Sequence, residues 1–248
     1  MKANSAQDMI FNGSQPQQYE FIKEQSPAFF EKIKQAVKNG NIEPQGGMWV
    51  EPDTNLPCGE SLIRQCFYGK TYFRKEFGKD VKTLWLPDVF GYTAALPQII
   101  KKCGMDNFLT IKLSWNTVNQ FPYHTFLWQG LGGSEVLVHM PPEGDYNSNA
   151  TPYAFDKISK KYKEKAVSKI AFMPFGIGDG GGGPGEYHVE MAKRCEKLPY
   201  LPKVKLSSSE SFFEELQKDT LKYPKHKGEL YLEKHQGTYT TQGKVKKE

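Results

Sequence analysis

The feature that most constrains the fold of this sequence is a regular alternation of short apolar segments with longer amphipathic ones. The short segments are typical of buried strands, and the longer ones repeat their apolar residues at helical spacing. Strands that alternate with helices of about 10–15 residues predict βαβ units and a mainly parallel sheet. Both a β/α barrel and a doubly wound α/β sheet fit this pattern.

The boundaries of the expected elements follow from apolar spacing and from glycines at the ends of segments. We expect helices over 26–39, 60–77, 94–103, 152–166, 185–198 and 209–220, the first capped by Ser26 and the second broken at Gly69. We expect strands over 48–50, 83–86, 108–113, 126–128, 135–139, 170–173, 204–206 and 230–232, with a hairpin between 126–128 and 135–139. The polar stretch 141–151 predicts a loop.

Composition excludes several classes of protein. The 248 residues suit one large α/β domain or two small ones. Lys and Arg total 33 and Asp and Glu 28, and this small basic excess is spread out apart from a tail at 244–247, so we expect no nucleic acid partner. No apolar run approaches the roughly 20 residues of a membrane span, and the N-terminus does not have the pattern of a secretory signal. The sequence does not indicate an oligomeric state.

The four cysteines show neither a CxxC pair nor a disulfide-rich spacing. Free thiols in a reducing compartment are therefore expected, which favours a cytoplasmic location, with a vacuole or lysosome as the alternative.

Acidic residues follow three of the expected strands. Glu51-Pro52-Asp53 follows 48–50, Asp88 follows 83–86, and Asp179 follows 170–173. The carboxyl ends of parallel strands share one face of an α/β fold, and that face holds the site. The three acidic positions could therefore converge for acid–base, nucleophilic or metal chemistry. The alternative is that each Asp only caps the helix that follows it.

The glycine-rich stretch 176–184 contains GxGxxG at Gly176, Gly178 and Gly181, after an expected strand and before an expected helix. This spacing is found in dinucleotide-binding turns. However, the next expected strand ends in serines rather than in an acid for the ribose, and Asp179 within the turn would repel a pyrophosphate. Glycines here could instead let the backbone approach a ligand closely around Asp179.

Aromatic residues in or after the expected strands add a weak indication of carbohydrate. Phe90 and Tyr92 follow Asp88, and the four tryptophans lie in or just after strands. Aromatic faces stack on sugar rings while carboxylates bind the hydroxyls, but most tryptophans in such positions belong to the core. The five histidines form no HxH, HxD or HExxH motif, so the sequence shows no complete local metal site.

Three of these segments together resemble glycoside hydrolase family 38, the retaining, metal-dependent α-mannosidases, in its cytosolic and vacuolar branch. The segments are GMWVEPDTNLP at 47–57, LWLPDVFGY at 84–92 and GDGGGGP at 178–184, and the likeness also runs through 112–116, 229–232 and 238–241. It covers nearly the whole chain in order. The resemblance implies an incomplete (β/α)7-type barrel with mostly parallel strands, as a single partial catalytic domain over 1–248.

The resemblance also implies roles for particular residues. Asp88 matches the family's catalytic nucleophile and metal ligand, and Asp179 falls where the family's general acid/base lies. Phe90 matches a motif aromatic near the sugar, Lys112 a basic substrate-contacting position and Asp53 a motif residue without an assigned role, and we expect all three to bind substrate. The expected substrate is a mannose-containing oligosaccharide with terminal α-linkages, and the expected cofactor is a divalent metal, Zn²⁺ or Co²⁺.

The sequence departs from the family at the metal site. The family's first strand ends in an H-x-D pair that supplies two ligands, and the chain has no HxD; the position of a fourth ligand lies beyond residue 248. One of four metal ligands, Asp88, therefore matches by motif. The resemblance implies an internal piece of a longer enzyme that is inactive alone. A non-catalytic carbohydrate-binding remnant and a dinucleotide-binding oxidoreductase are the alternatives.

Overall fold

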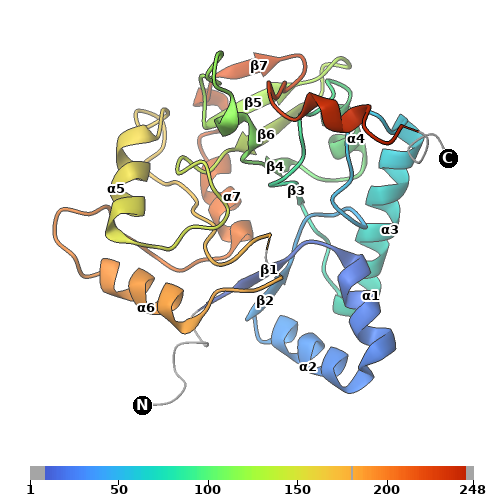
Figure 1. Cartoon of the computed structure of the whole chain (residues 1–248), viewed down its shortest axis with the longest axis horizontal. Helices are drawn as coiled ribbons and strands as arrows, with labels where there is room; N and C mark the ends of the chain where they lie inside the picture. The colour runs from blue at the N-terminus through green and yellow to red at the C-terminus, as the bar shows by residue number, and fades with distance from the viewer. Residues whose placement is uncertain (1–8, 180, 244–248) are drawn as a thin grey trace.

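The computed structural model describes residues 9–179 and 181–243, in which helices and strands alternate along most of the chain (Figure 1). Gly180 and the basic tail at 244–247 lie outside the described residues. The elements in chain order are β1 (Phe11–Gly13), α1 (Pro16–Gln25), α2 (Pro27–Lys38), β2 (Ile42–Pro44), α3 (Gly59–Phe77), β3 (Thr83–Trp85), α4 (Leu96–Lys102), β4 (Asn107–Leu109), η2 (Lys112–Trp115), β5 (Thr125–Gln129), β6 (Glu135–His139), α5 (Pro152–Lys161), α6 (Glu186–Cys195), α7 (Ser209–Gln217), η3 (Thr220–Lys222), β7 (Lys225–Lys227) and η4 (Gln236–Tyr239).

The strands form two sheets with mainly parallel pairing. Within the described residues, one sheet has the order β3-β4-β6-β5-β7, and β1 pairs with β2 in a separate sheet. Every pair is parallel except β5 with β6, which is the hairpin that the sequence predicts. An isolated parallel bridge from Gly46 to Leu84 brings the chain after β2 beside β3. The expected α/β fold with mostly parallel strands is therefore confirmed, whereas closure into a barrel is not established by these pairings.

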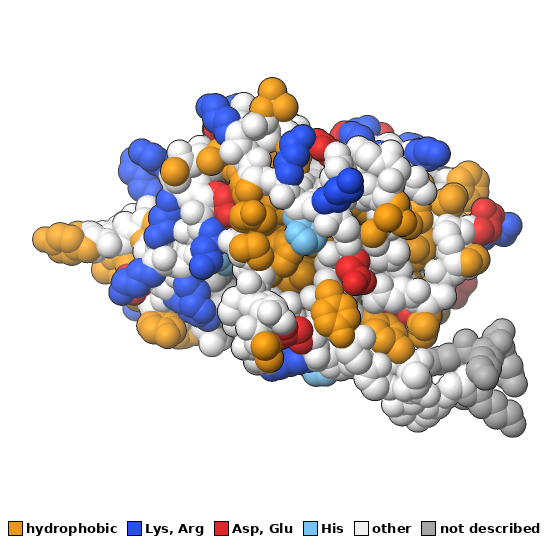
Figure 2. Space-filling view, turned by 90° about the horizontal axis from the view of Figure 1, so that it is seen from above, with side chains coloured by type: hydrophobic (Ala, Val, Ile, Leu, Met, Phe, Trp, Pro, Cys, Tyr) orange, Lys and Arg blue, Asp and Glu red, His pale blue; other side chains and the backbone are white. Residues whose placement is uncertain are grey.

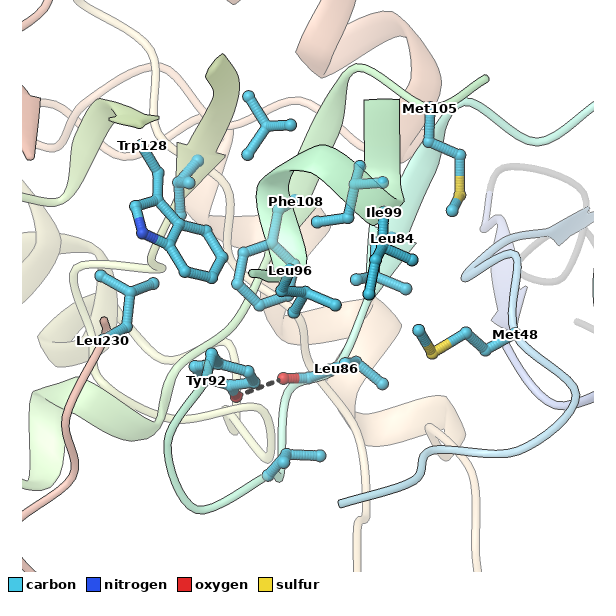
Figure 3. Close-up of a cluster of buried hydrophobic side chains, with 14 of the residues drawn as sticks. Met48, Leu84, Leu86, Tyr92, Leu96, Ile99, Met105, Phe108, Trp128 and Leu230 are labelled. Carbon is cyan, nitrogen blue, oxygen red and sulfur yellow. Dashed lines mark hydrogen bonds between the residues drawn. The ribbon is translucent and has the colours of Figure 1, made fainter. Parts of the chain in front are cut away.

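The main core packs α3 and α4 against the larger sheet. Figure 3 shows Trp128 of β5, Phe108 of β4 and Leu84 of β3 converging with residues of α4, and all three are fully buried. Burial of each such side chain contributes roughly 1.5–3 kcal/mol. At the lower edge of this cluster the Tyr92 hydroxyl donates to the Leu86 carbonyl at 2.9 Å. This bond fixes the chain just before Asp88.

Helices flank the strands on both sides. In Figure 1, α1, α2 and α3 lie to one side of the strands and α5 and α6 to the other. A second apolar cluster packs α7 against the larger sheet through residues that include Phe213, Trp85 and Leu137. On the face shown in Figure 2, basic and acidic side chains are interspersed with apolar and uncharged ones. Among the described residues, no helix combines the length and the apolar character that crossing a membrane requires.

Several of the expected strands are wrong. Residues 48–50, 170–173 and 204–206 form no strand, and 230–232 retains only an isolated bridge between Leu230 and Tyr92. A segment becomes a strand only when a neighbouring backbone accepts its hydrogen bonds. The Phe172 amide instead donates to the His139 ring at 3.2 Å, and the Trp49 amide donates to the Gln65 carbonyl at 3.0 Å.

Helix boundaries and caps also differ from expectation in places. The helix α3 continues through Gly69, and a Cβ at that position would lie 2.5 Å from the Gly47 carbonyl oxygen, so this glycine allows close packing rather than a break. The Ser26 side chain makes no capping bond; its carbonyl accepts from the Phe30 amide instead. The sequence pattern did not indicate α1, which buries only Pro16 and Tyr19 and therefore has no regular apolar face.

Candidate active site

The candidate site lies where three neighbouring strands of the larger sheet end. Asp88 follows β3, Lys112 begins the 3-10 turn η2 after β4, and Tyr146 lies in the loop after β6. Because β3, β4 and β6 are adjacent and parallel, their carboxyl ends meet at one edge of the sheet. The fold thus brings together side chains from three separate parts of the chain.

Asp88 is held by two neighbours. One carboxyl oxygen forms an ion pair with the Lys112 ammonium, and the other accepts a hydrogen bond from the Tyr146 hydroxyl at 2.9 Å. Lys112 is 2% exposed, and its ammonium lies 3.4 Å from the centre of the Trp115 ring. An ammonium taken out of water requires such compensation from a carboxylate and an aromatic face. These contacts orient the Asp88 carboxyl rigidly.

Asp179 reaches the same tyrosine from the glycine-rich loop. The Tyr146 hydroxyl lies 3.2 Å from each oxygen of the Asp179 carboxyl. The loop is fixed beside Tyr146 by a hydrogen bond from the Gly176 amide to the Ser148 carbonyl at 3.1 Å. The carboxyls of Asp88 and Asp179 therefore lie within two hydrogen-bond lengths of each other, across one hydroxyl.

Two cavities meet at these residues. The larger, of about 1280 Å³, is lined by Asp88, Asp179 and Tyr146, among others. The smaller, of about 480 Å³, is lined by Asp88 together with residues that include Phe90 and Asp53. Ligand sites are concave and have a few convergent polar groups, as these cavities do.

A third carboxyl, that of Glu51, lines both cavities. One of its oxygens accepts from the Ser14 hydroxyl at 2.9 Å. Burial raises the pKa of Glu51, and the nearby charge of Asp88 raises it further. Glu51 is thus a carboxyl that holds its proton more tightly than an exposed glutamate does.

The three expected substrate-binding residues occupy different surroundings. The Phe90 ring lies 4.8 Å from the His235 ring and lines the smaller cavity. Asp53 lines the same cavity, but its two oxygens accept from the Asn55 and Leu56 amides at 2.9 and 3.0 Å, so it also caps its own turn. Lys112 lies behind Asp88 and lines neither of the two cavities. Their roles toward substrate stay predictions.

The described residues do not fit a complete metal site. No group of three or more His, Cys, Asp or Glu side chains in the described part of the chain is placed to hold an ion. Asp88 is the one residue that the resemblance identifies as a ligand, and the ammonium of Lys112 on its carboxyl opposes a second cation there. Asp88 as a metal ligand therefore stays a prediction.

Two histidines near these strands have other roles. His139 is fully buried, with Nδ1 bonded to the Thr125 hydroxyl at 2.9 Å and Nε2 accepting from the Phe172 amide at 3.2 Å. Burial lowers the pKa of His139 well below its ordinary value, so the ring is a neutral part of the core. His235 is exposed and packs its ring near Phe90 and Trp115.

Tyr146 is a site residue that sequence reasoning missed, and Glu51 was noted among the acidic residues after strands without being assigned a role. Both follow the rule that singled out the aspartates, since each lies in a loop after an expected strand. Tyr146 lies in the predicted loop 141–151, which contains Glu143 and Asp145 but lies outside the segments that carry the family resemblance. Glu51 stands two positions before Asp53 in the same motif segment, and the resemblance assigns substrate binding to Asp53 only. The Tyr146 hydroxyl, which contacts two separate loops, is a signal that only the fold provides.

The glycine-rich loop does not have the context of a dinucleotide site. Such a turn must follow a strand, and residues 170–173 form none. A Cβ on Gly178 would lie 2.5 Å from the Tyr146 ring. The absence of a side chain at this glycine therefore allows the loop to pack against Tyr146, which carries Asp179 to the site.

Comparison with known proteins identifies the family. Residues 1–235 match the N-terminal domain of the glycosyl hydrolases family 38. The chain is 45% identical over 240 residues to alpha-mannosidase 2C1 of Homo sapiens, covering 97% of this chain and 23% of the relative. It is 40% identical over 247 residues to an alpha-mannosidase of Saccharomyces cerevisiae, covering 96% and 23%. The chain thus spans less than a quarter of the length of these relatives.

A solved structure agrees in fold. The crystal structure of an alpha-mannosidase from Enterococcus faecalis V583 has a TM-score of 0.73 and 18% identity, covering 92% of this chain and 26% of that one. At this identity the likeness supports the fold, and the sequence matches support the enzyme class. The chain belongs to glycosyl hydrolase family 38, a family of glycosidases, and corresponds to its N-terminal domain.

Proposed function

We propose that this chain is the catalytic region of a retaining α-mannosidase that removes terminal α-linked mannose from oligosaccharides. The observation that carries the proposal is the Tyr146 hydroxyl, which lies within hydrogen-bonding distance of both Asp88 and Asp179. Retaining glycosidases need two carboxyls roughly 5–5.5 Å apart, with the sugar between them. The relatives' names as alpha-mannosidases favour mannose as that sugar.

The proposed reaction has two halves. In the first, an Asp88 oxygen forms a bond to the anomeric carbon, the glycosidic C–O bond breaks, and Asp179 gives its proton to the leaving oxygen. In the second, Asp179 takes a proton from water, the water oxygen bonds to the anomeric carbon, and the ester to Asp88 breaks. The ion pair with Lys112 holds the Asp88 carboxyl in place for the first attack.

The two cavities suggest how an oligosaccharide would lie. Asp88 borders both, so the scissile bond would sit where they meet. Phe90 offers a ring face to a sugar on the side of the smaller cavity, and Asp53 and Glu51 offer hydroxyl partners there. The larger cavity has room for more than one sugar ring beside Asp179.

Three finer expectations belong to the same proposal. The two sheets are parts of one (β/α)7-type barrel, the working enzyme depends on a divalent ion such as Zn²⁺ or Co²⁺ with Asp88 as one ligand, and the protein is cytoplasmic. Such an ion, when bound, would supply Lewis-acid polarisation of sugar hydroxyls. The steps described for Asp88 and Asp179 do not involve it.

Covalent trapping tests the proposal without repeated turnover. A fluorine-substituted mannosyl fluoride has a leaving group that needs no acid and forms an ester that hydrolyses slowly. After incubation over hours, we expect peptide mass mapping to find the adduct on Asp88, and to find none in Asp88→Asn. Asp156→Asn, which alters an exposed carboxyl on α5, is the matched control and should label like the wild type.

Absence of an adduct in the wild type, or an adduct on another residue, would contradict the nucleophile assignment. A non-catalytic carbohydrate-binding remnant is the second candidate, favoured by the absence of a complete metal site among the described residues. It predicts saturable binding of mannose without any adduct, which calorimetry on the same sample would detect.

A further inference from the structure

Two of the four cysteines lie together where the helices α3 and α4 meet. Cys66 belongs to α3 and is 1% exposed within the main core cluster, and Cys103 is the C-cap residue of α4 and packs against that cluster. All four cysteines are free thiols in the structure. Neither Cys66 nor Cys103 lines either of the two cavities described above. The pair therefore belongs to a part of the molecule that the proposed reaction does not use.

Lys70 holds the face of α3 that carries Cys66 against the end of α4. Residues four positions apart lie on one face of a helix, so Cys66 and Lys70 point to the same side of α3. The Lys70 ammonium donates a hydrogen bond at 3.2 Å to the carbonyl of Gly104, the residue directly after Cys103. It also forms an ion pair with Asp80 at 3.1 Å, and Lys70 as a whole is 3% exposed. The two thiols therefore lie beside a buried cation that joins the two helices.

The two thiols differ in exposure and in acidity. Cys66 is buried, whereas Cys103 is half-buried, so a small oxidant in solution reaches Cys103 first. A hydrogen bond from the Cys66 thiol lowers the pKa of Cys103 despite its partial burial, and the positive charge of Lys70 lowers it further. The same hydrogen bond raises the pKa of Cys66, as does its burial. Because the thiolate is the reactive form of cysteine, Cys103 is the nucleophile of the pair and Cys66 is the thiol behind it.

We infer that Cys103 and Cys66 form a redox modification site, at which hydrogen peroxide converts the two thiols into a disulfide between α3 and α4. In the first step the Cys103 thiolate attacks one oxygen of the peroxide, the O–O bond breaks, and a sulfenic acid forms as hydroxide leaves. In the second step the Cys66 sulfur attacks the Cys103 sulfur, the S–O bond breaks and the S–S bond forms. Each departing hydroxide takes up a thiol proton, so two thiols and one peroxide give one disulfide and two waters.

The disulfide would join two helices that follow motif segments of the chain. The helix α3 comes after residues 47–57, and α4 comes after residues 84–92. A disulfide between these helices restricts the unfolded chain over residues 66–103 and thereby stabilises the folded protein. We expect oxidation to raise the midpoint of thermal unfolding by about 5–15 °C. Reduction with dithiothreitol should restore the original midpoint.

Peptide mapping without reduction tests the inference directly. Trypsin places the two cysteines on separate peptides, 65–70 and 103–112. After the reduced protein has been exposed to hydrogen peroxide, we expect mass spectrometry to find these two peptides linked, and to find them separate again after dithiothreitol. The variant Cys58→Ser, which removes an exposed thiol, is the matched control and should form the same link.

Two further variants test the order of the steps. In Cys66→Ser the sulfenic acid has no thiol to react with, so the 1,3-diketone dimedone should label Cys103. In Cys103→Ser the buried Cys66 should stay unlabelled. Unlinked peptides in the oxidised wild type, a link from Cys103 to a third cysteine, or a thermal midpoint that oxidation leaves unchanged would overturn the inference. These measurements involve no mannoside, so their outcome is independent of the proposed function.

Discussion

At the scale of the residue, the site depends on a charge that the fold has taken out of water. The Lys112 ammonium is buried, and its partner Asp88 is 33% exposed at the side chain. Burying a lone cation costs several kcal/mol, so Lys112 is tolerated because Asp88 and the Trp115 ring compensate it. The nucleophile proposed here is therefore also a structural partner, and its substitution should affect folding as well as chemistry.

A double-mutant cycle measures this dependence. We expect Asp88→Asn to lower the free energy of unfolding by about 3 kcal/mol, the lower end of the range for an ion pair with a buried member. In a background where Lys112→Met has already removed the cation, Asp88→Asn should cost less, because it leaves no unpaired charge. Urea unfolding followed by circular dichroism gives the four values. If the stability loss of the double variant equalled the sum of the losses of the two single variants, Asp88 and Lys112 would not be energetically coupled.

A second prediction at the scale of the residue concerns Glu51 and the pH dependence of protein stability. Because burial raises the pKa of Glu51, the folded protein holds that proton more tightly than the unfolded chain does. The resulting stabilisation is complete below the ordinary pKa of a glutamate and is lost as the pH rises through the raised value. We expect Glu51→Gln to gain stability relative to the wild type between pH 4 and pH 7, measured by urea unfolding at both values.

The exposed Glu31 of α2 offers a matched control for this pH effect. The variant Glu31→Gln should follow the wild type at both pH values. If the stability of Glu51→Gln also followed that of the wild type at both pH values, the Glu51 carboxyl would not be buried as the structure shows.

At the scale of the element, the sequence predicts best where one periodic pattern determines the structure. The helix expected over 26–39 is found as α2, and the expected hairpin as β5 and β6. The placement of acidic residues after strands brought Asp88 and Asp179 forward as candidates, and the structure brings them to one hydroxyl. The helix, the hairpin and the place of Asp88 depend on local spacing or on the common direction of parallel strands, whereas Asp179 follows no strand and reaches the site from the glycine-rich loop.

The features that could not be predicted depend on partners distant in the chain. Residues 170–173 have the composition of a strand, but their backbone meets the His139 ring instead of a neighbouring strand. The helix α1 is stabilised by packing on α2 and α3 rather than by a strong apolar face of its own. The Tyr146 hydroxyl meets both carboxyls only because the loop after β6 and the glycine-rich loop lie side by side.

The glycine-rich loop supplies the prediction at this scale. A Cβ at Gly178 would meet the Tyr146 ring at 2.5 Å and the Asn147 side chain at 2.2 Å, whereas one at Gly183 would have only an ordinary contact of 3.9 Å with Phe11. We expect Gly178→Ala to push the ring and Asp179 apart, and Gly183→Ala to leave them in place. Crystal structures of the two variants measure the distance from the Tyr146 hydroxyl to the Asp179 carboxyl, which should exceed the present 3.2 Å in Gly178→Ala only. The same distance in both alanine variants would show that the loop tolerates a side chain at Gly178.

At the scale of the whole molecule, the described residues provide part of what the proposed reaction needs. They provide two carboxyls at the edge of the sheet where its parallel strands end, a tyrosine between these carboxyls and two adjoining cavities. They do not provide a set of ligands for a divalent ion. Forming one covalent adduct from a mannosyl fluoride requires less of the site than repeated hydrolysis of a mannoside does. The fluoride leaving group needs neither an acid nor a metal ion to depart.

This difference leads to an expectation for the isolated chain. With a chromogenic α-mannoside, we expect no turnover, with or without added Zn²⁺ or Co²⁺, because Asp88 is the only predicted ligand that the described residues offer and the Lys112 ammonium competes for it. The alpha-mannosidase of Saccharomyces cerevisiae, assayed in parallel, is the positive control. Clear turnover that depends on added metal would contradict this expectation. It would mean that the chain forms an ion site from side chains that lie apart in this structure.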